Sequence, residues 1–147
     1  FQPVMEIEGL YNDFDLMETP VLGLMCQSSG IATKAARCRI AAGNLKLFSF
    51  GARRMHPAIS PMIERSSYIG GCDGVALVKG AEVLQIPAVG TIPHSLVIIM
   101  GGLTPALKAF DEIIEKDVPR VAVVDTFGER CRNFFPCSTI GGPFAVI

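Results

Sequence analysis

The sequence lacks a bulk charge of either sign. Its 147 residues include 13 Lys and Arg against 14 Asp and Glu, and only 18% of them are charged. Such a chain has no overall field that would attract it to nucleic acid or to an anionic membrane. We therefore expect no nucleic-acid partner and no membrane partner, and any anion must be bound locally.

Long apolar runs and paired cysteines are also missing. The longest apolar run, Leu96 to Met100, is far too short to span a bilayer, and no basic segment followed by an apolar one opens the chain. The five cysteines are irregularly spaced without a C-x-x-C pair, which argues against a disulfide framework and a zinc site. We expect a soluble protein of the reducing cytoplasm, with no metal site built from these residues.

The sequence does contain a large apolar fraction. Half of the residues are hydrophobic, which fits one compact globular domain with a sizeable core. The chain begins at Phe1 rather than Met, and residues 128–147 show neither strand alternation nor helical spacing over most of their length. We therefore expect a fragment that ends in an atypical tail.

The first part of the chain is predicted to form a strand and a long helix. Residues 4–11 alternate apolar and polar side chains, as expected for a half-exposed edge strand. A helix is predicted over residues 14–42, with Asn12 and Asp13 as capping residues and Gly43 at its end. Three residues should kink or interrupt this helix: Pro20, Gly23 and Gly30.

Short apolar runs then alternate with helical segments. Strands are predicted at 45–50, 74–78, 88–91 and 118–127, and helices at 61–68, 80–84 and 104–114. Residues 95–100 fit either type. The last helix should begin with Thr104 as its cap and bury one face, formed by Leu107, Phe110, Ile113 and Ile114. This order predicts an α/β fold of parallel strands joined by right-handed crossovers.

Polar residues follow these predicted strands. Arg53 and Arg54 come after the first, His94 after the third and Asp125 at the end of the fourth. In α/β barrels and open parallel sheets, ligands bind at the carboxyl ends of the strands. We therefore expect these four residues to converge.

The arginine doublet directly follows a strand that looks buried. Two buried guanidiniums without a partner would be costly, so an anion should meet them, and their planar forks suit a carboxylate or a phosphate. If the strand continued, Arg53 and Arg54 would point in opposite directions. The alternative is a pair of surface salt bridges with Glu64 or Asp73.

The two histidines have different predicted roles. If residues 95–100 are helical, His94 lies beside N-terminal amides that stabilise an anion, including a phosphate on the ring. A hydrogen-bonded structural histidine is the alternative. His56 could cap the next helix. Asp125 could bind magnesium, bind a hydroxyl, or act as a cap, and Phe50 could stack on a flat ring or lie in the core.

The glycine-rich segment over residues 70–74 matches neither a Walker nor a dinucleotide fingerprint. We expect a turn there, with a close approach of backbone to ligand as the alternative. Cys72 should be a small buried residue.

Three segments in register, FSFGARRMHP, YIGGCDGVALVKGAE and VGTIPHSL, resemble nicotinate phosphoribosyltransferases, in particular the bacterial and archaeal form. The resemblance extends roughly over residues 3–127. It implies a partial (β/α) barrel of the type II phosphoribosyltransferase kind over residues 45–127. Residues 1–44 would supply a strand and long helix of an α+β amino-terminal domain, and 128–147 the tail.

The resemblance implies that nicotinate and phosphoribosyl pyrophosphate form nicotinate mononucleotide and pyrophosphate, in NAD biosynthesis, with Mg²⁺. ATP hydrolysis would be coupled through a transient phosphohistidine at His94, the histidine of the family's G-T-x-x-H motif. Arg53, with Arg54 beside it, would face the anionic groups of the substrate. Three further kinds of contact complete the implied site: Phe50 stacks on the pyridine, Asp73 lies near the base, and Gly90, Thr91 and Ser95 line the pocket.

The resemblance further implies a homo-oligomer for the full-length form. Two alternatives stay open. A quinolinate phosphoribosyltransferase shares the architecture, although the G-T-x-x-H histidine argues against it. A truncated, non-catalytic product would only bind ligand or the full-length enzyme, because half a barrel leaves strand edges open.

Overall fold

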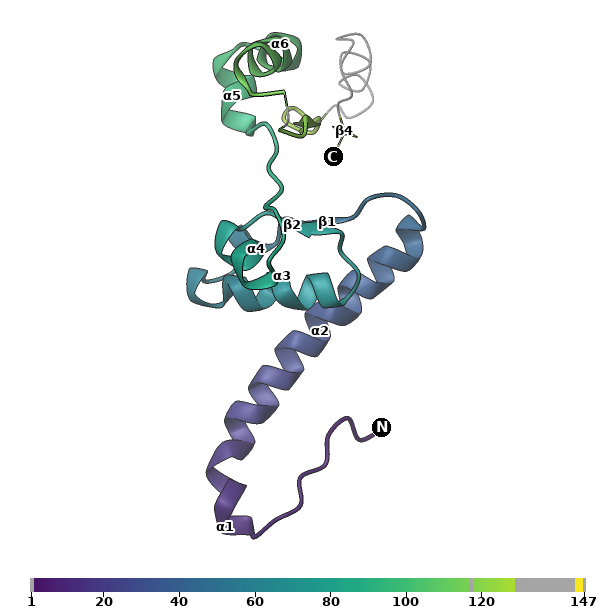
Figure 1. Cartoon of the computed structure of the whole chain (residues 1–147), viewed down its shortest axis with the longest axis vertical. Coiled ribbons are helices and arrows are strands. Elements are labelled where there is room, and N and C mark those ends of the chain that lie inside the picture. Colours follow the sequence, from purple (N-terminus) through teal and green to yellow (C-terminus); the bar gives the residue numbers. More distant parts are fainter. Residues whose placement is uncertain (1, 117, 129–144, 147) are drawn as a thin grey trace. The chain divides into compact units, whose positions relative to one another are not determined.

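The computed structural model describes residues 2–116, 118–128 and 145–146 (Figure 1). The chain divides into two compact units, Phe1–Ala88 and Val89–Ile147, and each is described by itself. The boundaries predicted after residues 44 and 127 stay predictions. Within the described ranges, no helix has the length and apolar composition needed to cross a membrane.

The first unit begins with three successive helical elements: α1 (Tyr11–Phe14), the 3₁₀ turn η1 (Asp15–Met17) and α2 (Glu18–Ala42). The predicted helix is thus interrupted at η1 and not at the residues expected to break it. Pro20 lies in the first turn of α2, where a missing N–H costs no intrahelical bond. Gly23 and Gly30 are simply helical. The predicted end is confirmed, since Gly43 caps α2 with φ 56°.

The edge strand predicted over residues 4–11 is wrong. Residues 4–10 form no strand, and Val4 is 84% exposed. An alternating pattern of side chains does not provide a neighbouring strand to pair with. Without one, the backbone N–H and C=O groups of an extended segment have no strand partners for their hydrogen bonds. The predicted caps are wrong too, because Leu10 is the N-cap of α1 and makes no side-chain bond.

The first unit contains a parallel pair of short strands, β1 (Phe48–Ser49) and β2 (Gly74–Val75). Phe48 pairs with Gly74 and Ser49 with Val75. Three elements connect β1 to β2: η2 (Ala52–Arg54), η3 (Pro57–Ile59) and α3 (Ser60–Ile69). The helix α4 (Val78–Leu84) follows β2. The predicted parallel pairing through a helix is confirmed, although the strands are shorter than the apolar runs that predicted them.

The glycine-rich segment lets α3 approach α2 closely. A Cβ on Gly70 would collide with the Ala32 carbonyl oxygen and the Ala35 Cβ, so only glycine fits there. Gly71 has φ 108° and packs over the Arg39 side chain. The predicted turn is confirmed, and the close backbone approach at Gly70 is to a helix. Cys72 is buried, as predicted.

The second unit packs two helices beside β3 (Val121–Ala122), which pairs in parallel with β4 (Ala145–Val146). Residues 95–100, which fitted either type, are almost entirely in α5 (His94–Ile99), and α6 (Leu103–Ile113) follows. Its apolar core consists of Ile92, Val97, Leu103, Ala106, Leu107, Ala122 and Val124.

The strand predicted over residues 118–127 is confirmed only at Val121–Ala122, and three further details of this unit differ from prediction. Residues 88–91 form no strand, but Ile92 N donates to Val121 O at 3.0 Å, so the chain passes beside β3. Gly102 caps α6 in place of Thr104. Ile113 is 79% exposed because it lies in the last turn, beyond the apolar core. The predicted tail, 128–147, lies mostly outside the described residues.

Candidate functional site

Arg53 and Arg54 lie in η2, directly after the carboxyl end of β1. The strand ends at Ser49, and the Arg54 N–H donates to Gly51 O at 3.0 Å to close a 3₁₀ turn. The strand does not continue through the two arginines, so the alternation expected for a continuing strand does not arise. Both side chains are exposed. Neither guanidinium forms a hydrogen bond or ion pair with any described residue.

The predicted salt bridges of this doublet with Glu64 or Asp73 are not formed, because both carboxylates have other partners. Water solvates Arg53 and Arg54 in this unit, so they do not require an anion to offset burial. Two cationic forks without a partner among the described residues nevertheless follow the strand end at successive positions, and each can bind an anion.

Asp73 lies at the amino-terminal end of the strand pair, just before β2. Its Oδ2 accepts a hydrogen bond from Leu47 N at 2.7 Å and forms an ion pair with Arg39, and Lys46 Nζ is 3.7 Å from Oδ1. The backbone bond from Leu47 and then the Arg39 bond hold the pKa of Asp73 below its ordinary value. Asp73 therefore connects the starts of β1 and β2, at the opposite end of the strands from Arg53.

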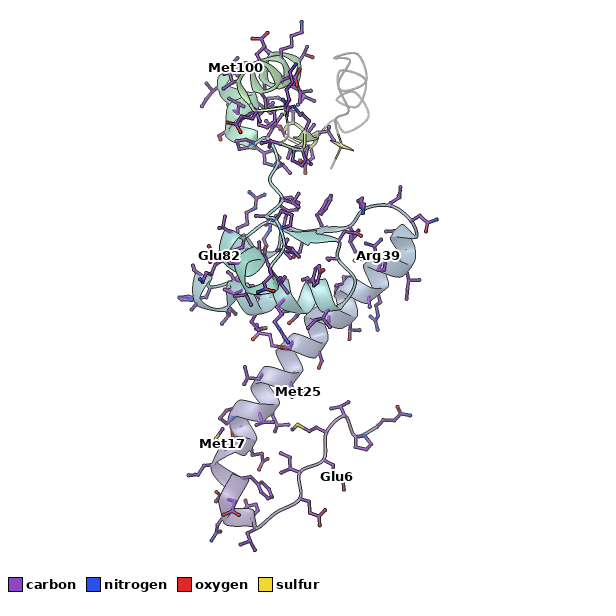
Figure 2. All side chains as sticks on the ribbon, viewed as in Figure 1. Glu6, Met17, Met25, Arg39, Glu82 and Met100 are labelled. Carbon is purple, nitrogen blue, oxygen red and sulfur yellow. The ribbon has the colours of Figure 1, made fainter. Side chains whose placement is uncertain are left out.

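Arg39 is the centre of the polar cluster around Asp73. Near the carboxyl end of α2 (Figure 2), its Nε donates to Gly71 O at 2.8 Å. Its Nη1 donates to Leu45 O at 2.7 Å and Gly43 O at 3.2 Å. One guanidinium therefore joins the end of α2, the strand entry and the turn before β2.

Glu64 is a fully buried carboxylate on α3, with 0% of its surface exposed. It accepts hydrogen bonds from Leu77 N at 3.0 and 2.9 Å and from Ala76 N at 3.2 Å. Gly80 of α4 leaves room for it, since a Cβ there would lie 2.5 Å from Oε2. Burial raises the pKa of Glu64 while the two backbone donors oppose that rise. Glu64 thereby fixes the segment that leaves the carboxyl end of β2.

Two further predicted residues, His56 and Phe50, follow β1 in the chain. His56 Nδ1 accepts from Ala58 N at 3.2 Å, which confirms its predicted capping role at η3. Phe50 is half-buried immediately after β1. Stacking on a ligand and packing in the core both stay open for Phe50.

His94 is the first residue of α5 and faces the segment after β3. Its Nδ1 lies 3.0 Å from Thr126 Oγ1, and its Nε2 lies 3.6 Å from Asp125 Oδ1. The side chain is 37% exposed. The structure therefore brings His94 and Asp125 together at a strand end, as predicted for this pair.

The remaining predicted residues of the second unit are sequence neighbours of His94. Gly90 and Ser95 are exposed and Thr91 is half-buried. Because Arg53 and His94 belong to different units, the prediction that they share one pocket stays a prediction.

Sequence reasoning missed three residues: Arg39, Glu64 as a buried ligand of backbone amides, and Thr126. Only Thr126 left a usable signal, since it is a hydroxyl residue directly after the predicted strand-end acid.

The described residues contain no group of three or more His, Cys, Asp or Glu side chains that could hold a metal ion. The single carboxylate beside His94 is not a magnesium site by itself. Magnesium stays an expectation from the resemblance.

Comparisons with known proteins agree on the chemical family. The family model described as the C-terminal domain of quinolinate phosphoribosyl transferase matches residues 31–133. Nicotinate phosphoribosyltransferase 1 of Arabidopsis thaliana is 36% identical over 116 residues, 78% of this chain and 20% of that protein. Nicotinate phosphoribosyltransferase of Bacillus subtilis is 33% identical over 127 residues, 86% of this chain and 25% of that protein. The chain thus spans a fifth to a quarter of these relatives.

A solved structure, nicotinate-nucleotide pyrophosphorylase from Pyrococcus furiosus, matches with a TM-score of 0.80 and 50% identity. The match covers 92% of this chain and 36% of that one. The predicted α/β fold of the type II phosphoribosyltransferase kind and the resemblance to nicotinate phosphoribosyltransferases are both confirmed. Since the family model matches well over half of the residues, this chain belongs to the quinolinate phosphoribosyl transferase family, in the part that corresponds to its C-terminal domain.

Proposed function

We propose that this chain is part of an enzyme of NAD biosynthesis that transfers the phosphoribosyl group of phosphoribosyl pyrophosphate to nicotinate. The products are nicotinate mononucleotide and pyrophosphate. The names of the Arabidopsis and Bacillus relatives support this substrate class, since both are nicotinate phosphoribosyltransferases.

The main supporting observation is the exposed pair Arg53 and Arg54, which has no anionic partner among the described residues. Nicotinate has one carboxylate and phosphoribosyl pyrophosphate has several further negative charges. A guanidinium binds either group through two parallel N–H donors. In the proposed site, Phe50 stacks on the pyridine, and Gly90, Thr91 and Ser95 line the pocket. Asp73 is not included in the proposed site, because its carboxylate is bonded to Arg39 and to Leu47 N at the amino-terminal end of the strands.

In the proposed reaction the pyridine nitrogen attacks C1 of the ribose while the bond from C1 to the pyrophosphate oxygen breaks. Negative charge develops on the departing pyrophosphate, and positive charge develops on the sugar. Arg53 and Arg54 stabilise the former if they face the leaving group, because a cation placed where charge develops lowers the barrier.

His94 is proposed to couple ATP hydrolysis to this transfer through a phosphohistidine. Its ring is accessible, with 37% of the side chain exposed, and it is oriented by a carboxylate and a hydroxyl. This arrangement is the usual one for an activated nucleophile, in which a neighbouring group orients the reacting side chain.

A second candidate is a quinolinate phosphoribosyltransferase, in which the pyridine substrate has two carboxylates. The family model supports it, and so does the higher identity to the Pyrococcus pyrophosphorylase than to the named nicotinate enzymes reported above. Two adjacent guanidiniums would also suit two carboxylates. Turnover of quinolinate without any effect of ATP would favour this candidate.

The test uses the protein expressed from its complete gene, with formation of nicotinate mononucleotide as the readout. Arg53→Ala should lower kcat/KM about 100-fold, because losing one charge-stabilising donor costs about 3 kcal/mol in the transition state. Arg65→Ala, which removes another exposed arginine of the first unit, is the matched control and should be nearly neutral. Equal activity of the two variants would contradict the role of Arg53.

The ATP step has its own test. His94→Ala should abolish the stimulation by ATP and leave a slow ATP-independent transfer. Unchanged stimulation in that variant would refute the assigned role. A protein that binds nicotinate or a full-length copy of the enzyme without any turnover would instead fit a non-catalytic binding product.

A further inference from the structure

The turn that carries Arg53 and Arg54 is bonded to the helix α3. Ser60, the first residue of α3, is buried, and its Oγ donates to Ala52 O at 3.2 Å. Ala52 is the first residue of η2, and the same hydroxyl lies 3.4 Å from His56 O. A hydroxyl has one hydrogen to donate, and the shorter contact is the one to Ala52. A buried side chain of α3 therefore holds the start of η2.

The helix α3 is itself fixed to the carboxyl end of the strand pair by Glu64. Glu64 lies four residues after Ser60, so the two side chains are neighbours on one face of α3. Its carboxylate accepts hydrogen bonds from the Ala76 and Leu77 amides, which follow β2. The Ala76 amide also donates to Ser49 O, at the end of β1, at 3.1 Å. Ser60 and Glu64 thus connect one helix to the segments that follow both strands.

The guanidiniums of Arg53 and Arg54 have no comparable support of their own. Within the part of the chain that the structure describes, neither forms a hydrogen bond or an ion pair. Both side chains are exposed. The region in which they can meet an anion is therefore set by the backbone of η2. Such placement matters, because misplacing a reacting or stabilising group by about 1 Å can lower a rate about 100-fold.

We infer that Ser60 is a positioning residue for Arg53 and Arg54, and that Glu64 fixes the helix from which Ser60 acts. Ser60 acts through the backbone of η2 and not through contact with a substrate. The inference rests on the proposed function where it concerns turnover of nicotinate. It gives a role to two buried polar side chains of α3 that the proposed reaction does not otherwise use.

The support of η2 by Ser60 is tested without any assay of activity. Hydrogen exchange of the protein expressed from its complete gene, followed by mass spectrometry, reports on the Arg54 and Met55 amides that close the turn. Ser60→Ala should speed their exchange about fivefold, as expected for one lost hydrogen bond. Ser66→Ala is the matched control, since this buried serine of α3 donates within its own helix, to Met62 O at 2.8 Å. Equal exchange in Ser60→Ala and wild type would overturn the inference.

The link to the arginines is tested by a double-mutant cycle on the formation of nicotinate mononucleotide. Ser60→Ala should lower kcat/KM about tenfold in the otherwise wild-type enzyme, and Ser66→Ala less than about twofold. In an Arg53→Ala background, Ser60→Ala should cost less than about threefold, because a guanidinium through which it acts is gone. A general loss of structure would cost the same factor in both backgrounds, so equal factors would overturn the positioning role.

The part assigned to Glu64 is tested by Glu64→Gln, which replaces an acceptor oxygen by an amide nitrogen that cannot accept. Exchange of the Leu77 amide should rise about fivefold. Exchange in η2 should rise with it, because α3 is then less firmly held. Glu82→Gln, at an exposed carboxylate of α4, is the control. Faster exchange after β2 without any change in η2 would overturn this role of Glu64.

The outcomes separate this inference from the proposed function. A protein that shows the expected exchange in Ser60→Ala but forms no nicotinate mononucleotide would sink the proposed function and leave the support of η2 by α3 standing. A protein that forms the product at the same kcat/KM in Ser60→Ala as in wild type would uphold the proposed function and overturn the positioning role.

Discussion

The two units of the chain keep their elements together by different means. In the Val89–Ile147 unit the buried side chains form an apolar cluster around Leu107. Its one buried charge among the described residues, Arg120, donates to carbonyls near the end of α6 and pairs with Asp111. In the Phe1–Ala88 unit the buried set is rich in polar groups: Ser49, Ser60, Glu64, Ser66 and Ser67.

The difference shows two ways of defining a structure. An apolar cluster gains its stability from area and volume and tolerates changes of shape that conserve them. A buried polar group must meet a particular partner, as when Ser67 Oγ donates to Ile63 O at 3.0 Å. Among the described residues, no buried side-chain nitrogen or oxygen lacks a partner. The structure of the first unit therefore depends on specific hydrogen bonds in addition to buried apolar residues such as Ile63 and Val75.

The largest effect is expected in the apolar unit. Leu107→Ala should lower the free energy of unfolding by about 3 kcal/mol, because it leaves a cavity where the wild-type side chain is fully buried. Ile113→Ala, on the exposed end of the same helix, should change it by less than about 0.5 kcal/mol. Hydrogen exchange of the α6 amides measures both, and equal losses would show that Leu107 is not part of a packed core.

A comparable test of the first unit is Gly70→Ala. The added Cβ would meet the Ala32 carbonyl, so α2 and α3 must separate, at a cost of about 2 kcal/mol. Gly30→Ala is the matched control, since nothing lies within 4 Å of a Cβ there. In the control, alanine should stabilise α2 by about 0.5 kcal/mol or more. Chemical denaturation measures both, and two stabilising substitutions would refute the close approach of the helices.

A smaller effect, with a distinctive pH dependence, is expected for Glu64→Gln. The amide nitrogen cannot accept from a backbone N–H, so about 1 kcal/mol is lost at neutral pH. Burial raises the pKa of Glu64, so the folded state holds its proton more readily than the unfolded state does. Wild-type stability should therefore fall, relative to Gln, as pH rises from about the ordinary pKa of 4.5 through the raised value.

The control for this comparison is Glu82→Gln, which changes an exposed carboxylate of α4. Urea denaturation across the acid range provides the readout. A wild-type-to-Gln difference at Glu64 that does not vary with pH would contradict the raised pKa.

The smallest effect, and one of opposite sign in pH, is expected for Asp73→Asn. The pKa of Asp73 is lowered, so its contribution is complete above the ordinary value of 3.8 and is lost as pH falls through the folded value. The wild-type protein should thus lose its stability advantage over Asp73→Asn in acid, whereas its stability relative to Glu64→Gln should rise there. Thermal melts at successive acid pH values measure this. A difference that grows on acidification would place Asp73 away from Arg39.

Several features were predictable from the sequence because they depend on neighbours along the chain. The capping glycine at Gly43 and the apolar spacing of Leu107 act within one or two helical turns. The parallel pairing of β1 with β2 followed from the helix between them. The position of Arg53 at a strand end followed from the same pattern.

The tertiary structure alone decided which partner each polar group takes. Asp73 pairs with Arg39, 34 residues away, and not with the nearer arginine doublet. Thr126 meets His94 across 32 residues, and Glu64 meets the amides after β2 across 12 and 13. Local periodicity does not contain these choices, because a hydrogen bond depends on distances of about 3 Å that only the packed chain brings about. The sequence thus determined the order of the elements and the chemistry available at the strand ends, and the packing determined which of those groups remain free to bind a ligand.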